Sequence, residues 1–213
     1  MAISRRSSSS TIPSCSNDAG AAASGILCRV EHLDLAALEA GIDEIRRSPR
    51  EEGRVELIVR RPAQGERERL TEATLDTADG LVGDNWKTRG SSRRPDGSAN
   101  PKAQLTIKNA RMAALVAQTP ERWELAGDQL YVDFDLSTEN IPPGTRLEIG
   151  SAVIEVTDEP HTGCRKYLDR FGKDALRLVS SETGRALNLR GINTRVVVAG
   201  VVRTGDRVSK ASS

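Results

Sequence analysis

The sequence lacks the features that mark several large classes of protein. Aromatic residues make up 3% of the 213 residues, and no interleaved basic and aromatic pattern suggests binding of single-stranded nucleic acid. No apolar run approaches the roughly 20 residues that a membrane-spanning helix needs. The longest run, residues 194–202, has the length of a strand and is interrupted by Arg195. We therefore expect no membrane partner and no nucleic-acid partner.

The sequence also has little net charge and few cysteines. Its 31 lysines and arginines face 30 acidic residues, giving a formal charge of +1, so any anion site must be local. The three cysteines, Cys15, Cys28 and Cys164, lie far apart and form no disulfide framework. This cysteine usage predicts a protein of a reducing compartment, the cytoplasm.

The first 24 residues differ in composition from the rest. They are rich in serine and alanine and hold almost no bulky apolar side chain, so they cannot bury enough surface to offset the entropy of ordering. We predict a disordered tail over residues 1–24 and a single domain over residues 25–213. Arg5 and Arg6 among the serines also resemble a weak transit peptide, which is the organellar alternative.

Hydrophobic periodicity predicts an α+β protein that is mainly β, with a few helices. Helical spacing covers residues 33–45, capped by Asp34, residues 109–116, capped by Asn109, and residues 173–180. Strand-like patterns cover residues 55–59, 70–75, 130–136, 146–149, 152–156, 196–198 and 205–208. Several short strands separated by turn signals are typical of a barrel or a sandwich.

One block places a thiol among groups that can activate it. His161, Cys164, Arg165 and Lys166 follow a predicted strand. A cysteine acts as nucleophile or metal ligand in its thiolate form, which nearby positive charge favours. The residues alone favour a simpler interpretation, in which Cys164 is an inert, buried cysteine beside a solvated helix face, because this arrangement is the commoner one. One histidine and one cysteine do not complete a zinc site.

An ordered set of motifs around this block resembles the MOSC domain, the C-terminal domain of molybdenum cofactor sulfurases. The set comprises residues 83–86, 104–107, 135–140, 143–150, 161–164, 190–193 and 205–206. The resemblance covers residues 54–210 and implies a MOSC-like β-barrel with a few helices. It also implies a molybdenum cofactor, in which a pterin (molybdopterin) holds the metal.

The resemblance implies that a single cysteine ligates molybdenum or carries sulfur. By position this residue is Cys164, with His161 beside it to assist proton transfer or metal binding. Family members differ in whether they bind the cofactor, carry sulfur or reduce N-hydroxylated compounds, so the reaction stays open. No segment resembles the pyridoxal-phosphate domain of full-length sulfurases. We therefore expect a separate partner, a cysteine desulfurase or an electron-transfer protein.

The implied cofactor ends in phosphate, which arginine forks and lysine bind well. Candidate cofactor-binding residues flank the motifs: Asp84, Asn85, Lys87, Arg89, Lys166, Arg190, Asn193 and Arg195. Each also has a simpler interpretation, as a solvated surface cation or as a turn residue.

Other residues near the motifs are assigned to structure. Asp128 and Asp206 are interpreted as turn residues, and Trp86 and Trp123 as packing residues. The alternative function is a non-catalytic β-barrel module that binds an anionic ligand, in which Cys164 is incidental.

Overall fold

The structure, a computed structural model, describes residues 31–92 and 94–212. The predicted tail over residues 1–24, with Cys15, lies outside these ranges, as does Cys28, and the predicted domain boundaries stay a prediction. The described strands are β1 (Glu52–Arg60), β2 (Glu68–Leu70), β3 (Glu72–Asp76), β4 (Gly80–Leu81), β5 (Leu105–Asn109), β6 (Leu130–Asp133), β7 (Arg146–Ile149), β8 (Ala152–Val156), β9 (Ile192–Val198), β10 (Gly200–Arg203) and β11 (Arg207–Lys210). The described helices are α1 (Leu35–Ala40), α2 (Ile42–Arg46), α3 (Trp86–Arg89), α4 (Ala110–Ala117), α5 (Arg165–Ser180) and α6 (Glu182–Ala186), with the 3₁₀ helices η1 (Pro101–Ala103) and η2 (Pro120–Ala126).

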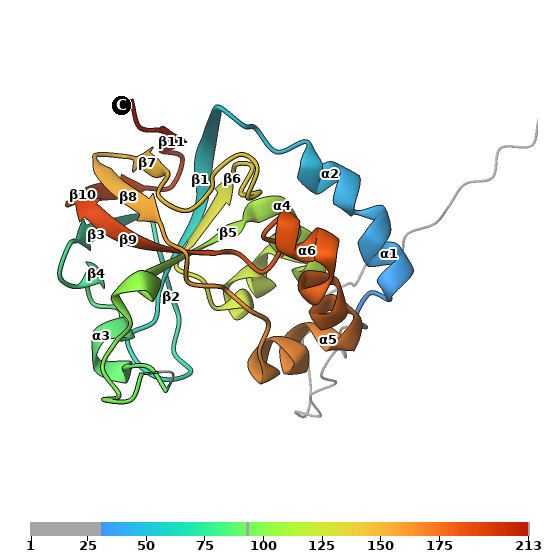
Figure 1. The fold of residues 1–213 in the computed structure, drawn as a ribbon. Coiled ribbons are helices and arrows are strands. Elements are labelled where there is room, and N and C mark those ends of the chain that lie inside the picture. Colours follow the sequence, from blue (N-terminus) through green and yellow to red (C-terminus); the bar gives the residue numbers. More distant parts are fainter. Residues whose placement is uncertain (1–30, 93, 213) are drawn as a thin grey trace, which may run out of the picture. The chain divides into compact units, whose positions relative to one another are not determined.

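Seven strands close into a barrel (Figure 1). In the order β1, β11, β7, β8, β9, β5 and β6, each strand is hydrogen-bonded to the next, and β6 pairs with β1 to complete the circle. Among the described strand pairs, β5 and β6 alone run parallel, and α4 and η2 form the crossover that such a pair requires. Outside the barrel, β10, β3 and β4 form a small antiparallel sheet. The predicted β-barrel with a few helices is confirmed.

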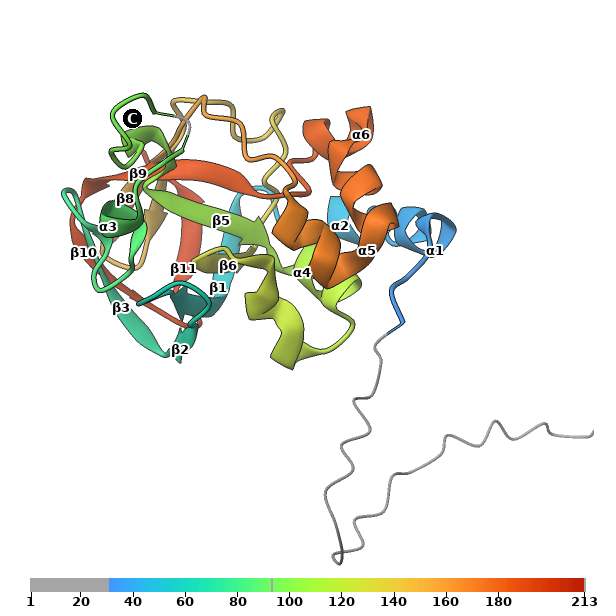
Figure 2. The same cartoon turned by 90° about the horizontal axis from the view of Figure 1, so that it is seen from below.

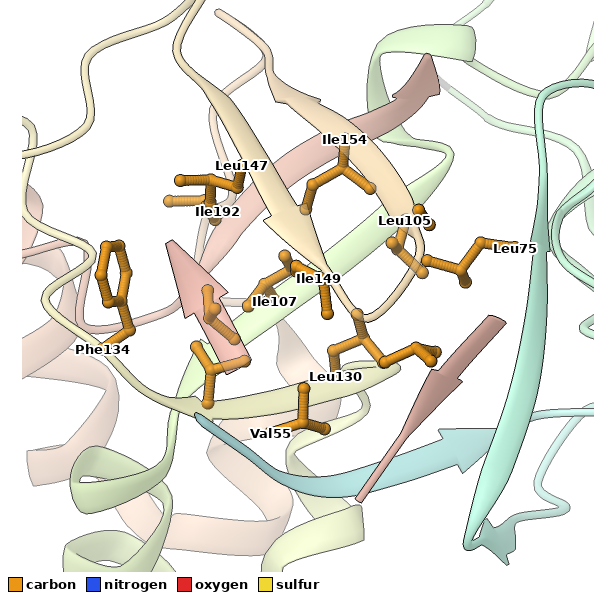
Figure 3. Close-up of a cluster of buried hydrophobic side chains, with 14 of the residues drawn as sticks. Val55, Leu75, Leu105, Ile107, Leu130, Phe134, Leu147, Ile149, Ile154 and Ile192 are labelled. Carbon is orange, nitrogen blue, oxygen red and sulfur yellow. The ribbon is translucent and has the colours of Figure 1, made fainter. Parts of the chain in front are cut away.

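Alternating side chains fill the barrel. In β8 the burial alternates along the strand, as expected when one face of a strand meets a core and the other meets solvent. Val55, Ile107, Leu130 and Ile149 come from four different strands, are fully buried and point into the interior (Figure 3). Val208 of β11 belongs to the same cluster, so the barrel core joins the first strand to the last.

Helices α1, α2, α4, α5 and α6 gather on one side of the barrel, away from β10, β3 and β4 (Figures 1 and 2). A second apolar cluster joins these helices to the barrel, and it includes Leu38, Met112, Tyr131, Tyr167 and Phe171. Both predicted caps are present. The carboxylate of Asp34 accepts a hydrogen bond from Ala37 N, and the amide oxygen of Asn109 accepts one from Met112 N, each at a distance of 2.9 Å. No described helix has the length and apolar character to cross a membrane.

Two predicted elements are divided in the structure, and a third begins earlier than expected. The helix expected over residues 33–45 is divided at Gly41 into α1 and α2, and the strand expected over residues 70–75 is divided at Thr71 into β2 and β3. The helix expected over residues 173–180 is the second half of α5, which begins directly after Cys164. Gly172 separates the halves, with φ 86° and ψ 171°, a conformation that is essentially confined to glycine.

Candidate functional site

A cavity of about 520 Å³ lies between the barrel and the first half of α5. This volume is in the range of sites for small molecules and cofactors, roughly 300–1,000 Å³. Strand residues Thr106 and Asn193 line the cavity, together with the segment from Glu159 to Thr162 and residues of α5. Among the described lining residues are five arginines, one lysine and a single acidic residue, Glu159. The cavity is therefore strongly basic in a chain of almost no net charge.

Cys164 lies at the rim of this cavity and precedes the first turn of α5. Its backbone is extended, and its carbonyl oxygen accepts from Tyr167 N at 3.0 Å and from Leu168 N at 3.1 Å, so the residue caps the helix. The thiol is free and exposed. Cys164 is therefore not the buried cysteine of the simpler interpretation, because it is exposed and lines a basic cavity.

His161 lines the same cavity and is largely buried, with 14% of its side chain exposed. Its Nδ1 lies 3.5 Å from Asp128 Oδ1 but makes no hydrogen bond in the described part of the chain. Burial, followed by repulsion from Arg190, lowers the pKa of His161 to about 3. The imidazole is therefore neutral at pH 7 and can accept or donate one proton.

Arg190 and Asp128 form a buried ion pair behind the cavity wall. Arg190 Nη1 donates to both carboxylate oxygens of Asp128, at 2.9 Å and 3.2 Å, and Nη2 donates to Ala126 O at 3.1 Å. Burial disfavours the charge of Arg190, but Asp128, Tyr167 and Cys164 outweigh it, so the pKa of Arg190 is raised. The assignment of Asp128 to a turn was incomplete, because its carboxylate is fully buried as the partner of Arg190.

Asp84 plays the same part for a second cavity residue, Arg61. The two carboxylate oxygens accept from Arg61 Nε and Nη2, each at 2.9 Å, and one of them also accepts from Trp86 N. Asp84 is thus a buried counter-ion that also shapes the turn. Its neighbour Asn85 does not line the cavity, although its amide oxygen is buried without a hydrogen bond from any described residue.

The structure separates the remaining candidates. Arg89, Lys166 and Asn193 line the cavity with Cys164, and Asn193 Nδ2 donates to Glu159 O at 3.1 Å. Lys87 instead pairs with Asp79 at 2.7 Å on the surface, and Arg195 pairs with Glu155 at 2.7 Å. Neither Lys87 nor Arg195 is among the described residues that line the cavity.

Comparison with known proteins identifies the family. The model of the MOSC domain matches residues 97–209, which is more than half of the chain. The chain belongs to the MOSC domain family. Members of this family are known for binding the molybdenum cofactor or for sulfur transfer. No curated protein matches the chain.

Solved structures agree on the fold. The YUAD protein from Bacillus subtilis is 20% identical, with a TM-score of 0.55 over 76% of this chain and 97% of its own. YiiM from Geobacillus stearothermophilus is 12% identical, with a TM-score of 0.50 over 75% of each chain. At these sequence identities, the similarity of the two structures to this MOSC protein shows a shared fold and nothing about function.

The cavity of this MOSC protein offers donors for a ligand that brings its own metal. No group of three or more His, Cys, Asp or Glu side chains is placed to hold a metal ion in the described ranges. Cys164 is the cavity residue that would ligate the metal of a molybdenum pterin. Three buried polar atoms at the cavity have no described hydrogen-bond partner: His161 Nδ1, Tyr167 Oη and Arg190 Nε. These residues therefore fit a polar ligand such as a pterin.

Lys108 does not line the cavity but contacts Tyr167, which does, and sequence reasoning missed it. It is fully buried in β5, and its Nζ donates to Leu189 O at 2.8 Å. Burial lowers the pKa of Lys108 to about 7. Two basic groups lie over the ring of Tyr167, with Lys108 Nζ 5.4 Å and the Arg190 guanidinium 5.0 Å from the ring centroid. A lysine inside an apolar strand pattern was the available signal.

Two cavity arginines were also missed, Arg61 and Arg67. They lie outside the family-like motifs, and no local pattern distinguishes them from solvated arginines.

Proposed function

We propose that this MOSC protein binds a molybdenum-pterin cofactor in the basic cavity, with Cys164 as the molybdenum ligand or as the carrier of a sulfur atom. The observation that carries the proposal is the set of three unsatisfied polar atoms, on His161, Tyr167 and Arg190, beside an exposed thiol. Buried polar groups in native proteins almost always have partners. Three without one in a single cavity support a bound polar ligand.

Each residue has a defined part in such a site. Asp128 and the carbonyl oxygen of Ala126 hold the guanidinium of Arg190 in place, so this side chain loses little conformational entropy when a ligand binds. Burial raises the pKa of Tyr167 well above its ordinary value, so its hydroxyl stays protonated at neutral pH and can donate a hydrogen bond. Neutral His161 supplies one donor and one acceptor. When bound, the cofactor would supply two-electron redox chemistry at its metal.

The finer form of the proposal depends on a partner. As a sulfur carrier, Cys164 would hold a persulfide received from a separate cysteine desulfurase. As part of a reductase of N-hydroxylated compounds, the site would receive electrons from a separate electron-transfer protein. The exposed position of Cys164 supports access by either partner or by a substrate.

The test is cofactor content after expression in a host that makes the cofactor. We expect the wild-type protein to copurify with pterin, measured by fluorescence after oxidation, and with molybdenum, measured by elemental analysis, or with a Cys164 persulfide, measured by mass spectrometry. Cys164→Ser should lose the metal or the persulfide and keep the pterin. Wild-type protein with none of the three would contradict the proposal.

Helix α3 provides a matched pair of variants. Arg89→Met removes a cavity cation, whereas Lys87→Met removes a surface cation two residues away. We expect reduced pterin content in Arg89→Met and unchanged content in Lys87→Met. If neither variant changes it and Cys164 is alkylated by iodoacetamide no faster than Cys15, a non-catalytic anion-binding module is the better description.

A further inference from the structure

Four arginines from distant parts of the sequence donate to four consecutive carbonyl oxygens at the end of η2. The bonds are Arg67 Nε to Glu124 O (2.9 Å), Arg170 Nη1 to Leu125 O (2.7 Å), Arg190 Nη2 to Ala126 O (3.1 Å) and Arg61 Nη1 to Gly127 O (2.7 Å). The last carbonyls of a helix lack partners within it and carry partial negative charge. They hold the four guanidinium groups in a row, and all four arginines line the cavity.

Two members of this row are neutralised and two are not. Arg61 and Arg190 pair with the buried carboxylates of Asp84 and Asp128. Among the described residues, neither Arg67 nor Arg170 forms an ion pair, although both are partly removed from water. The row therefore ends in two adjacent, uncompensated positive charges.

The two guanidinium groups of Arg67 and Arg170 repel each other, and a bound anion would remove this repulsion. Burial and then repulsion from Arg170 lower the pKa of Arg67. Each guanidinium carries five N–H donors, and the bonds to backbone carbonyls occupy only some of them. A phosphate monoester carries a charge of about −1.5 to −2 at pH 7 and three acceptor oxygens, so it matches two forks in charge and in hydrogen bonding.

We propose that Arg67 and Arg170 form a subsite for the phosphate end of the ligand whose other end reaches Cys164. The first half of α5 sets the spacing, since Arg170 follows Cys164 by six residues, about 9 Å along a helix axis. The proposal deepens the proposed function and rests on it for the identity of the ligand. Two sources have the required chemistry, the phosphate of the cofactor itself and a phosphorylated substrate.

The subsite is tested with inorganic phosphate and pyrophosphate, by calorimetric titration of full-length protein from a host that cannot make the cofactor. We expect wild-type protein to bind, Arg170→Met and Arg67→Met each to weaken binding about tenfold or more, and Arg170→Lys to bind with intermediate affinity because a point charge replaces the fork. Circular dichroism and thermal unfolding identify any variant that has not folded.

The matched control is Arg165→Met. Arg165 lies on the same helix, pairs with Asp169 and is 83% exposed outside the cavity. We expect unchanged phosphate affinity in this variant. No binding by wild-type protein, or equal losses in Arg165→Met and in folded Arg170→Met, would overturn the proposal, because bulk charge would then account for the effect.

Cofactor-loaded protein distinguishes the two sources. If loading abolishes phosphate binding, the cofactor's own phosphate occupies the subsite. If loaded protein still binds phosphate and loses it in Arg170→Met, a phosphorylated substrate is the source. Failure of the cofactor to copurify would count against the proposed function alone, since phosphate binding to cofactor-free protein is measured independently.

Discussion

Replacing Asp128 with alanine should be strongly destabilising, because it leaves a buried arginine without its counter-ion. The Asp128 side chain is fully buried and that of Arg190 is 9% exposed, so water cannot replace the lost carboxylate. Removal of one partner of such a pair typically costs about 3–5 kcal/mol. The remaining bond from Arg190 to Ala126 O and the contact with the Tyr167 ring are already present and offset none of this loss.

The assay is urea unfolding followed by circular dichroism, supported by thermal unfolding. For a domain of 150–250 residues, each kcal/mol shifts the midpoint by about 2–4 °C, so the expected decrease is about 6–20 °C. Asp206→Ala is the matched control, because Asp206 also follows a glycine but lies in an exposed turn, where its Oδ2 accepts from Arg203 N at 2.7 Å. We expect that control to cost about 1 kcal/mol.

The contribution of Asp128 to the free energy of unfolding should also depend on pH, and it should decrease in acid. Burial alone would raise the pKa of Asp128, but the neighbouring basic groups, Arg190 above all, outweigh it, so the folded-state pKa lies below the ordinary value. The unfolded chain therefore takes up the proton first as the pH falls, and the stabilising contribution is lost in acid. The difference between wild type and Asp128→Ala should be full at pH 7 and shrink below about pH 4. A loss under about 1 kcal/mol at pH 7, or one that does not change in acid, would refute the reasoning.

Three further outcomes are expected. Because burial lowers the pKa of Lys108 to about 7, the unfolded chain binds a proton between pH 7 and about 10 that the folded chain lacks, so stability should rise with pH by up to about 1.4 kcal/mol per unit. Lys108→Met should abolish this rise in urea titrations, and an unchanged slope would contradict the assignment. Gly172→Ala should cost about 1–3 kcal/mol in the same assay, since a Cβ would also lie 2.7 Å from His32 Nδ1. Gly65→Ala, with φ 92° and open space, should cost less and separates strain from clash. Iodoacetamide should modify Cys164 in the native protein, and complete protection would contradict its exposure.

Most barrel strands could be predicted from the sequence because their burial alternates. The patterns over residues 146–149 and 152–156 coincide with β7 and β8. The start of α5 was missed because its first half is mostly polar, and Gly172 interrupts the helical spacing. Tyr167 and Phe171, four residues apart and both buried, were the available signal for that half. Closure of the barrel by β1 and β11 depends on long-range pairing, which no local pattern contains.

The site was predictable to the extent that family-like motifs contain it. Cys164, Lys166 and Arg190 meet in one cavity as neighbours of those motifs. The motifs do not indicate on which face of a helix or strand a side chain lies. For this reason Lys87 and Arg195 were predicted as cofactor-binding residues, although both form ion pairs outside the cavity. Buried ion pairs leave even less trace in the sequence, because their partners lie 23 and 62 positions apart.

The two buried ion pairs explain how four arginines can lie close together in one basic cavity. Asp84 and Asp128 neutralise the two arginines that they hold, which lowers the cost of burying four guanidinium groups along one helix end. Loss of either carboxylate should then affect folding more than ligand affinity. Arg67 and Arg170 keep their charge uncompensated, so their loss should affect ligand affinity more than folding. The division of the row into paired and unpaired arginines thus assigns stability to one half and anion recognition to the other.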